Sequence, residues 1–193
     1  MKLSKSLLLA SNSPRRRQIL SEAGFTFDVQ VKPTDELFPS TMPPDEVPVF
    51  LAIEKAAAFD DLPDDTLLLT ADTVVLINGE ILNKPSDSDE AFVMLRKLSG
   101  QMHQVITGVC LRSNERIVTF ADTTKVYFKE LTDEEIRYYI KTCHPFDKAG
   151  SYGVQDFIGM AGIERIEGSF FTVMGLPIHR VYEALKPYVV WDE

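Results

Sequence analysis

Short apolar runs alternate with amphipathic segments along this chain. The run at 7–10 has the length and composition of a short buried strand, and further strands are predicted at 26–31, 103–112 and 116–129. In other segments apolar residues recur every three or four positions, which predicts helices at 14–24, 45–60, 87–98, 132–142 and 176–186. In the helix at 87–98 we expect the inward positions to be Ala91, Met94, Leu95 and Leu98. Strands that alternate with helices in this way are typical of an α/β protein.

Three segments add to this pattern. The stretch LLLTADTVVLINGEILNKP predicts a long strand, a type I′ turn at Asn78-Gly79 and a short return strand. Residues 32–46 read as a proline-rich loop, and such loops lie at the surface and often border a site. Residues 144–177 are rich in turns and hold six of the ten glycines. The sequence shows no repeat or low-complexity linker, so we expect one domain over 1–193.

Composition and charge narrow the function classes. With 193 residues, 45% of them apolar and 25% charged, the chain has an ordinary globular composition. The net charge of −9 argues against a nucleic-acid polymer or an anionic membrane as partner, because both bind basic surfaces. Cys110 and Cys143 lie far apart without metal-like spacing, which predicts reduced, structural thiols in a cytoplasmic protein. The apolar run at 7–10 is too short for an export signal or a membrane span.

The start of the helix expected at 14–24 carries an unusual charge pattern. Ser13 and Pro14 are typical of an N-cap and a first helical position. The next three residues, 15–17, are all arginine, although a helix N-terminus is electropositive and normally attracts acidic side chains. A small anion bound at this end of the helix would account for the three cations.

Helical phase separates the three arginines. Arg15 and Arg16 lie four and three residues before Ile19, which is expected to face the core, so they flank the buried side of the helix. Arg17 is expected to point to water. A phosphate or carboxylate at the helix N-terminus would then meet backbone N–H groups and two guanidinium groups together. The alternative is a solvated basic patch, which the weak dipole effect at an exposed helix end would tolerate.

Two further charged residues lie in apolar surroundings. Asp72 interrupts an apolar strand, where an unpaired carboxylate would be costly. Such a group is usually paired, metal-bound or catalytic, and the alternative is an exposed position at a strand end or a bulge. Lys55 shares a helix face with Leu51 and Ala58. It is either a snorkelling side chain with its ammonium in water or a ligand for an anion.

The segment HPFDKAGSYGVQ, residues 144–155, has no clear period. Asp147 and Lys148 precede two glycines there, as in a binding loop, although the same residue types are common in ordinary turns. The chain has no G-x-x-x-x-G-K-[ST] sequence, so a P-loop would not hold the phosphates of a nucleotide.

Seven motifs follow one another along nearly the whole chain. They are S-x-S-P-R-R at 11–16, EKA at 54–56, ADT at 71–73, the NGEILNKP hairpin, LSGQMHQVITGV from 98, DKAGSYGVQ from 147 and GLP at 175–177. In this order they closely resemble the motifs of the Maf family, the septum-formation-type nucleoside triphosphate pyrophosphatases. Their joint occurrence is highly specific.

The resemblance implies an α/β fold with a mixed twisted sheet, flanking helices and two lobes around a central cleft, related to inosine-triphosphate pyrophosphatases. The implied reaction is hydrolysis of a nucleoside triphosphate to the monophosphate and pyrophosphate with a divalent metal cation, Mg²⁺ or Mn²⁺. A homodimer, a house-cleaning role in the nucleotide pool and a link to septum formation are compatible with it.

The resemblance also implies roles for particular residues. Asp72 matches the proton acceptor for the attacking water. Five residues match positions that line the phosphate side of the substrate: Ser13, Arg16, Lys55, Lys84 and Lys148. Three match positions that bear on the choice of base: Arg15, Thr73 and Gln155. Glu36 matches an acidic position linked to metal or water.

The same motifs distinguish two branches of the family. Arg15, Thr73 and Gln155 resemble the branch associated with dTTP and UTP. The branch associated with 7-methyl-GTP tends to carry a different residue before the second arginine and Asp-Gln in place of Asp-Thr. A compact Thr73 with the amide of Gln155 can match the O4, N3–H and O2 edge that thymine and uracil share. Modified pyrimidine nucleotides are further candidate substrates.

Three alternatives stay open at this point. The chain could bind nucleotides without hydrolysing them, as a regulator of cell division, or it could release single phosphates as a phosphatase. It could also be a related pyrophosphatase that prefers purine nucleotides or 7-methyl-GTP. A nucleotide panel with the products identified separates these alternatives.

Overall fold

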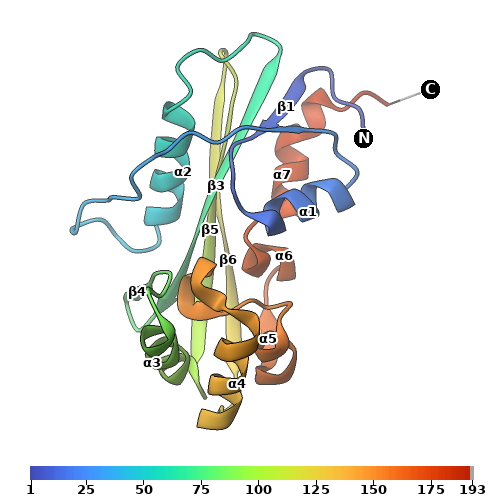
Figure 1. The fold of residues 1–193 in the computed structure, drawn as a ribbon. Coiled ribbons are helices and arrows are strands. Elements are labelled where there is room, and N and C mark those ends of the chain that lie inside the picture. Colours follow the sequence, from blue (N-terminus) through green and yellow to red (C-terminus); the bar gives the residue numbers. More distant parts are fainter. Residues whose placement is uncertain (192–193) are drawn as a thin grey trace. The chain divides into compact units, whose positions relative to one another are not determined.

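The computed structural model describes residues 1–191, and within them seven strands form a mixed sheet (Figure 1). The strands are β1 Ser6–Leu9, β2 Asp28–Val29, β3 Thr66–Ile77, β4 Glu80–Leu82, β5 Met102–Arg112, β6 Ile117–Phe128 and β7 Ile163–Glu167. Their order is β2-β1-β3-β5-β6-β7, with β4 paired to β3. β1 runs parallel to β2 and β3, whereas β4 is antiparallel to β3 and β7 to β6. This confirms the predicted α/β fold with a mixed sheet.

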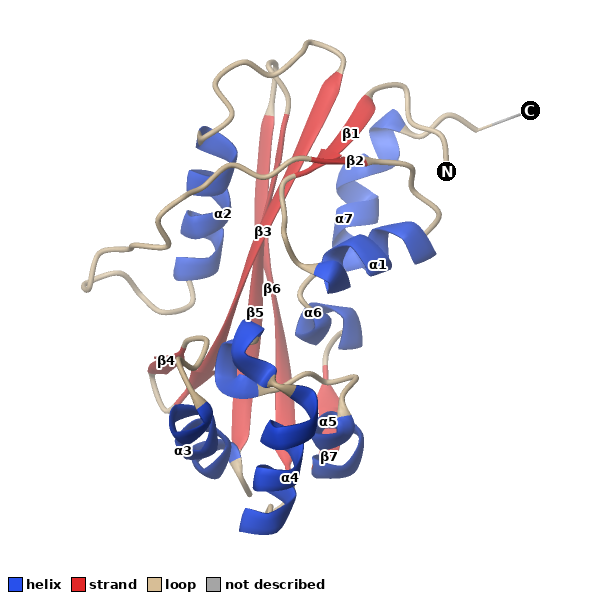
Figure 2. Ribbon diagram, viewed as in Figure 1, coloured by secondary structure: helices blue, strands red, loops and turns tan. Residues whose placement is uncertain are grey.

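Helices flank the strands (Figure 2). In the described residues the α-helices are α1 Pro14–Glu22, α2 Val47–Ala57, α3 Ser88–Leu98, α4 Asp133–Cys143, α5 Phe157–Gly162, α6 Phe170–Met174 and α7 Ile178–Leu185. Short 3-10 helices lie at Pro145–Asp147, Ala149–Ser151 and Lys186–Tyr188. The helices predicted from apolar periodicity are α1, α2, α3, α4 and α7, and all five are present.

Local details of two elements also follow the predictions. Asn78 and Gly79 both have positive φ, 50° and 80°, as a type I′ turn between β3 and β4 requires. Helix α3 begins after Asp87, whose carboxylate accepts hydrogen bonds from the next turn of backbone, and it buries the four expected positions Ala91, Met94, Leu95 and Leu98. The periodic apolar pattern therefore located both the helix and its buried face.

Two predictions of secondary structure were wrong in extent. The strand expected at 26–31 contains only Asp28–Val29, which pair with the end of β1. The segment 144–177 is not only turns, because it holds α5, β7 and α6. Gly159 lies inside α5, where a Cβ atom would lie 2.2 Å from the carbonyl oxygen of Val154. Glycine allows close packing at this position. A prediction of turns from glycine content cannot distinguish a closely packed glycine from one in a turn.

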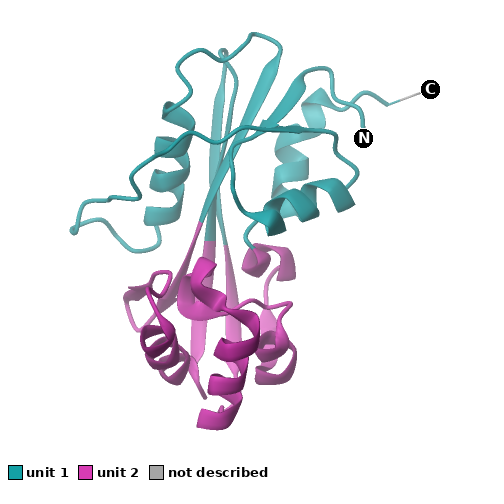
Figure 3. Ribbon diagram, in the orientation of Figure 1, with its two compact units in different colours: residues 1–72, 107–122, 175–193 teal, residues 73–106, 123–174 magenta. Residues whose placement is uncertain are grey.

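The chain forms two compact units (Figure 3). Unit 1 consists of residues 1–72, 107–122 and 175 onward, and unit 2 of residues 73–106 and 123–174. In β3 the chain passes from unit 1 to unit 2 between Asp72 and Thr73. Two units agree with the two lobes that the resemblance implies, while the assignment of a single domain over 1–193 stays a prediction.

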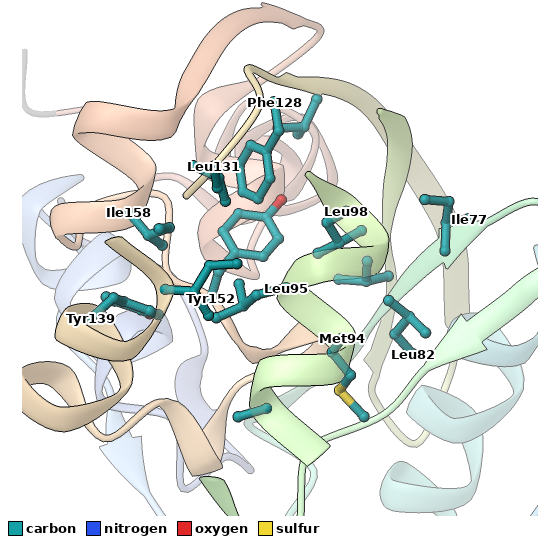
Figure 4. Close-up of a cluster of buried hydrophobic side chains, with 14 of the residues drawn as sticks. Ile77, Leu82, Met94, Leu95, Leu98, Phe128, Leu131, Tyr139, Tyr152 and Ile158 are labelled. Carbon is teal, nitrogen blue, oxygen red and sulfur yellow. The ribbon is translucent and has the colours of Figure 1, made fainter. Parts of the chain in front are cut away.

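Each unit has a hydrophobic core of its own. In unit 1 a buried cluster joins α2 to the strands through Ala10, Ala52, Ala56, Phe59, Leu62, Leu68 and Cys110. In unit 2 a larger cluster joins α3 and α4 to the strands (Figure 4), and it includes Leu82, Met94, Leu95, Leu98, Phe128, Leu131, Tyr139, Tyr152 and Ile158. Burial of apolar area at this scale is the main stabilising term for each unit.

A polar pair lies within the core of unit 2. The Nε2 atom of His103 lies 2.7 Å from the hydroxyl oxygen of Tyr152, and the His103 ring packs edge-to-face against Phe128 and Tyr152. Burial lowers the pKa of His103 to about 4 and raises the pKa of Tyr152. Both side chains are therefore neutral at pH 7.

Two further expectations concern the cysteines and the possibility of a membrane-spanning helix. Cys110 and Cys143 are free thiols, as predicted from their spacing. Across the described residues, no helix is both long enough and apolar enough to cross a membrane.

Candidate active site

The first turn of α1 begins as the sequence predicts. Ser13 is the N-cap, and its Oγ accepts a hydrogen bond from the N–H of Arg16 at 3.5 Å. Pro14 occupies the start of the helix. Arg15 and Arg16 are half-buried and Arg17 is exposed. The order of exposure expected from helical phase is therefore confirmed.

Arg16 is tied to backbone in unit 1. Its Nε donates to the carbonyl oxygen of Gly175 at 2.8 Å, and its Nη1 donates to the carbonyl oxygen of Ala71 at 2.8 Å. The same Nη1 also lies 3.2 Å from Ser11 Oγ. Because Ala71 precedes Asp72 in β3, Arg16 fixes the peptide next to the predicted base. The sequence indicated that Arg16 points inward but did not indicate this anchoring of backbone.

These contacts also bear on the unusual charge of the helix start. Burial lowers the pKa of Arg16, while the charge of Asp72 acts in the opposite direction. Two backbone carbonyl oxygens supply negative potential to the guanidinium, and such charge-assisted hydrogen bonds are stronger than neutral ones. The positive charge of at least one of the three arginines is thus stabilised by groups of the protein, without a bound anion. The role of Arg16 at the phosphates stays a prediction.

Asp72, Lys55 and Glu36 form a contiguous group in unit 1. Asp72 is buried in the interior of β3, so the alternative that placed it exposed at a strand end is wrong. The Nζ of Lys55, from α2, donates to Asp72 Oδ1 at 2.5 Å and to Glu36 Oε1 at 2.8 Å. The snorkelling interpretation of Lys55 is therefore wrong, since its ammonium binds two carboxylates. Glu36 enters the group from the proline-rich loop that the sequence placed at the edge of a site.

The donor set of this group fits a divalent cation. Carboxylate oxygens are the ligands that Mg²⁺ and Mn²⁺ prefer, and Mg²⁺ commonly takes one or two protein carboxylates plus oxygens of a substrate phosphate. Glu36 and Asp72 both contact Lys55 Nζ, so their oxygens lie near each other around that ammonium. Among residues 1–191, no three His, Cys, Asp or Glu side chains are grouped to hold a metal by themselves. A metal in this group would therefore need further oxygen ligands, such as water molecules or a substrate phosphate.

Unit 2 carries the remaining predicted site residues. Thr73 lies half-buried in β3, and Lys84 lies exposed after β4. Lys148 is held by two carboxylates, with its Nζ 2.7 Å from Asp147 Oδ1 and 3.7 Å from Asp156 Oδ2. Lys148 thus resembles Lys55 in binding two acids. The sequence did not single out Asp156 as a site residue. It follows Gln155 and is the N-cap of α5.

The amide of Gln155 has an unusual environment. Its Oε1 atom is buried and has no hydrogen-bond partner among the described residues. Buried polar atoms are rarely left unpaired in folded proteins, because removing them from water without a partner is costly. An unpaired acceptor at this position suits a ligand that brings an N–H donor. Gln155 follows Lys148 in the same loop, as the DKAGSYGVQ motif requires.

Comparison with known proteins gives a consistent result along the chain. The family described as Maf-like protein matches residues 6–188. A protein of Phocaeicola vulgatus named dTTP/UTP pyrophosphatase is 49% identical over 182 residues, which cover 93% of this chain and 94% of that protein. Proteins of the same name from Porphyromonas gingivalis and Flavobacterium psychrophilum are each 47% identical, covering 94% and 91% of both chains respectively. This chain belongs to the Maf-like protein family.

Proposed function

We propose that this chain is a nucleoside triphosphate pyrophosphatase, which hydrolyses dTTP and UTP to the monophosphate and pyrophosphate. The observation that carries the proposal is the buried carboxylate of Asp72, bound at 2.5 Å to the ammonium of Lys55 in the interior of β3. Identities of 47–49% to proteins named dTTP/UTP pyrophosphatase, over more than nine-tenths of the chain, support the substrate class.

Asp72 acts as the proton acceptor in this proposal. A water molecule attacks the α-phosphorus, the bond from that phosphorus to the bridging oxygen breaks, and pyrophosphate leaves. Asp72 takes the proton of the water, a role that contributes typically about 10²–10⁴-fold to a rate. Lys55 holds the carboxylate in one orientation and offsets its charge, so that an anionic substrate is less repelled. Arg16 keeps the Asp72 backbone in place through the Ala71 carbonyl oxygen.

A divalent cation, Mg²⁺ or Mn²⁺, is part of the proposal. Glu36 and Asp72 are the residues that would hold it, because Mg²⁺ and Mn²⁺ prefer carboxylate oxygens. When bound, such an ion neutralises phosphate charge and favours departure of pyrophosphate. The phosphate-side residues Lys84 and Lys148 supply further positive charge, which phosphoryl chemistry needs because the reacting centre is surrounded by anionic oxygens.

The unpaired Gln155 oxygen supports the choice of base. Thymine and uracil both carry an N3–H that can donate to Oε1, whereas N3 of cytosine carries no hydrogen and would place an acceptor against an acceptor. Sites built to hydrogen-bond a particular group reject analogues that leave a buried polar atom unpaired. Thr73 and Arg15 complete the base-choice set that the family resemblance implies.

A house-cleaning role for the protein in the cytoplasmic nucleotide pool fits this reaction. Hydrolysis of triphosphates to monophosphates removes unwanted nucleotides from the supply for polymerases. A homodimer and a link to septum formation belong to the proposal as the family resemblance implies them.

The test is a panel of nucleoside triphosphates with Mg²⁺ or Mn²⁺, in which the products are identified. We expect pyrophosphate and a monophosphate, with dTTP and UTP preferred at least tenfold in kcat/KM over CTP and the purine triphosphates. Asp72→Asn serves as the inactive control. Release of orthophosphate would favour the phosphatase alternative, and binding without turnover would favour the regulator. A panel in which 7-methyl-GTP or dITP is best would overturn the choice of branch.

A further inference from the structure

Tyr139, in α4, reaches the loop that carries Gln155. Its ring is fully buried in the core of unit 2 (Figure 4). Its hydroxyl donates to Asp156 Oδ2 at 3.0 Å and accepts from the N–H of Gly153 at 3.1 Å. One buried hydroxyl thus binds both ends of a four-residue turn whose third residue is Gln155.

The turn from 153 to 156 is tightly closed. The N–H of Asp156 donates to the carbonyl oxygen of Gly153 at 3.0 Å. A Cβ atom on Gly153 would lie 2.5 Å from Asp156 Oδ2, so an alanine side chain there would force the Asp156 carboxylate to shift. Tyr139 reaches this turn from α4 with two hydrogen bonds. The Tyr139 hydroxyl therefore ties both ends of the turn around Gln155 to α4, in addition to the backbone hydrogen bonds of the turn itself and of α5.

The same turn is coupled to Lys148. The Asp156 carboxylate lies 3.7 Å from Lys148 Nζ, and the Lys148 Cε would lie 3.1 Å from a Cβ on Gly153. Burial and the neighbouring Asp156 charge both raise the pKa of Tyr139, so its hydroxyl stays protonated and able to donate. If that hydrogen bond were lost, the turn would lose its tie to α4 and the Asp156 carboxylate would keep its ion pair with Lys148 without the tyrosine contact.

We infer that Tyr139 and Asp156 are positioning residues for the selection of the base: together they fix the turn that presents the unpaired Gln155 oxygen. The inference rests on the proposed function, because it concerns how that function distinguishes thymine and uracil from cytosine. The physical reason is orientation. An acceptor that is held in one direction favours an N–H donor strongly, whereas a mobile amide can rotate to offer its NH₂ group to cytosine instead.

The chain offers a matched pair of variants. Tyr139→Phe removes the hydroxyl and keeps the buried ring. Tyr138→Phe makes the same change on the neighbouring residue, whose side chain is exposed and packs edge-to-face on Phe157. The measurement is kcat and KM for dTTP and dCTP, together with calorimetric affinities for their non-hydrolysable α,β-imido analogues.

We expect Tyr139→Phe to reduce the preference for dTTP over dCTP at least fivefold, mainly through a higher KM and weaker analogue binding for dTTP. Tyr138→Phe should keep the preference of the parent. A purely structural role would lower the active fraction, which reduces kcat for both nucleotides equally and leaves both KM values unchanged. That pattern, or an unchanged preference in Tyr139→Phe, overturns the inference.

A second pair covers the case in which Tyr139→Phe does not fold. Asp156→Ala removes the acceptor of the tyrosine hydroxyl without changing the buried aromatic ring, and Asp156→Asn retains an oxygen that can accept. We expect the alanine variant to lose preference as Tyr139→Phe does and the asparagine variant to keep it. Equal preference in both contradicts the inference. If the parent protein itself shows no preference for the dTTP analogue, the proposed function is wrong. If the parent shows the preference and the variants keep it, only the positioning role of Tyr139 and Asp156 is wrong.

Discussion

Replacement of Arg16 by alanine tests the anchoring of the backbone next to Asp72. The substitution removes the donors that the carbonyl oxygens of Ala71 and Gly175 receive at 2.8 Å. Hydrogen bonds to a charged group contribute about 1.5–3 kcal/mol each, and these two are only partly buried, so the lower end applies. The longer contact to Ser11 adds little. We therefore expect the free energy of unfolding to fall by about 3 kcal/mol, which corresponds to about 10 °C in Tm for a domain of this size.

Arg17→Ala is the matched control, because the same residue type lies next in the helix but is exposed, with its Nη2 donating a solvent-accessible hydrogen bond to the Asn12 carbonyl oxygen at 2.9 Å. Its loss should change the free energy of unfolding by less than about 0.5 kcal/mol, as for most surface substitutions. Denaturant unfolding followed by circular dichroism measures both variants. Equal losses would refute the helical-phase assignment and favour a diffuse basic patch.

The activity of the same variants adds a second readout. Well below both melting temperatures, Arg16→Ala should lower kcat/KM for dTTP at least tenfold, or about 1.4 kcal/mol, and Arg17→Ala should have little effect. Arg16→Lys keeps the charge but not the planar fork that reaches several acceptors, so we expect it to recover only a small part of either loss. Full recovery by lysine would show that charge alone matters.

Three other substitutions test separate parts of the structure. Asp72→Asn should abolish hydrolysis while triphosphate binding is kept or improved, and turnover at the parent rate would exclude Asp72 as the base. Thr73→Gln should reduce the preference for dTTP and UTP, as a nucleotide panel will show. His103 has a pKa of about 4 in the folded state, against about 6.5 when unfolded. The unfolded state therefore binds more protons in that interval, and stability should fall by about 3 kcal/mol as the pH decreases from 6.5 to 4. His103→Gln should flatten this dependence in unfolding measured at pH 7 and 4.5.

Periodicity and turn chemistry predicted most of the secondary structure. Helix α3 was located together with its buried face because four apolar residues recur at helical spacing. The Asn78-Gly79 turn was found because few other dipeptides adopt positive φ at both positions. Helices α5 and α6 were missed because they are short. Glycine within α5 also reads as a turn signal, although its use there is close packing.

The candidate site was predictable only in part. Asp72 and Lys55 each stand out in the sequence as charges on apolar elements, but their contact joins a strand to a helix 17 residues away and needed the structure. Tyr139 gave no signal, because an aromatic residue on the buried face of a helix is normally a core residue. Its hydroxyl acquires a second role only because the loop at 153–156 folds onto it.

Each unit holds one lysine between two acids of unequal exposure. The side chain of Asp72 is 11% exposed and that of Glu36 47%, around Lys55. Asp156 is 20% exposed and Asp147 54%, around Lys148.

Exposed ion pairs contribute only about 0–1 kcal/mol, whereas a sheltered partner is costly to remove. Under the proposed function, phosphate oxygens can therefore replace the exposed acid while the sheltered acid keeps the lysine oriented. A protein with a net charge of −9 can in this way bind a highly charged anion, because its cations are already positioned and only their weaker partners need to be displaced.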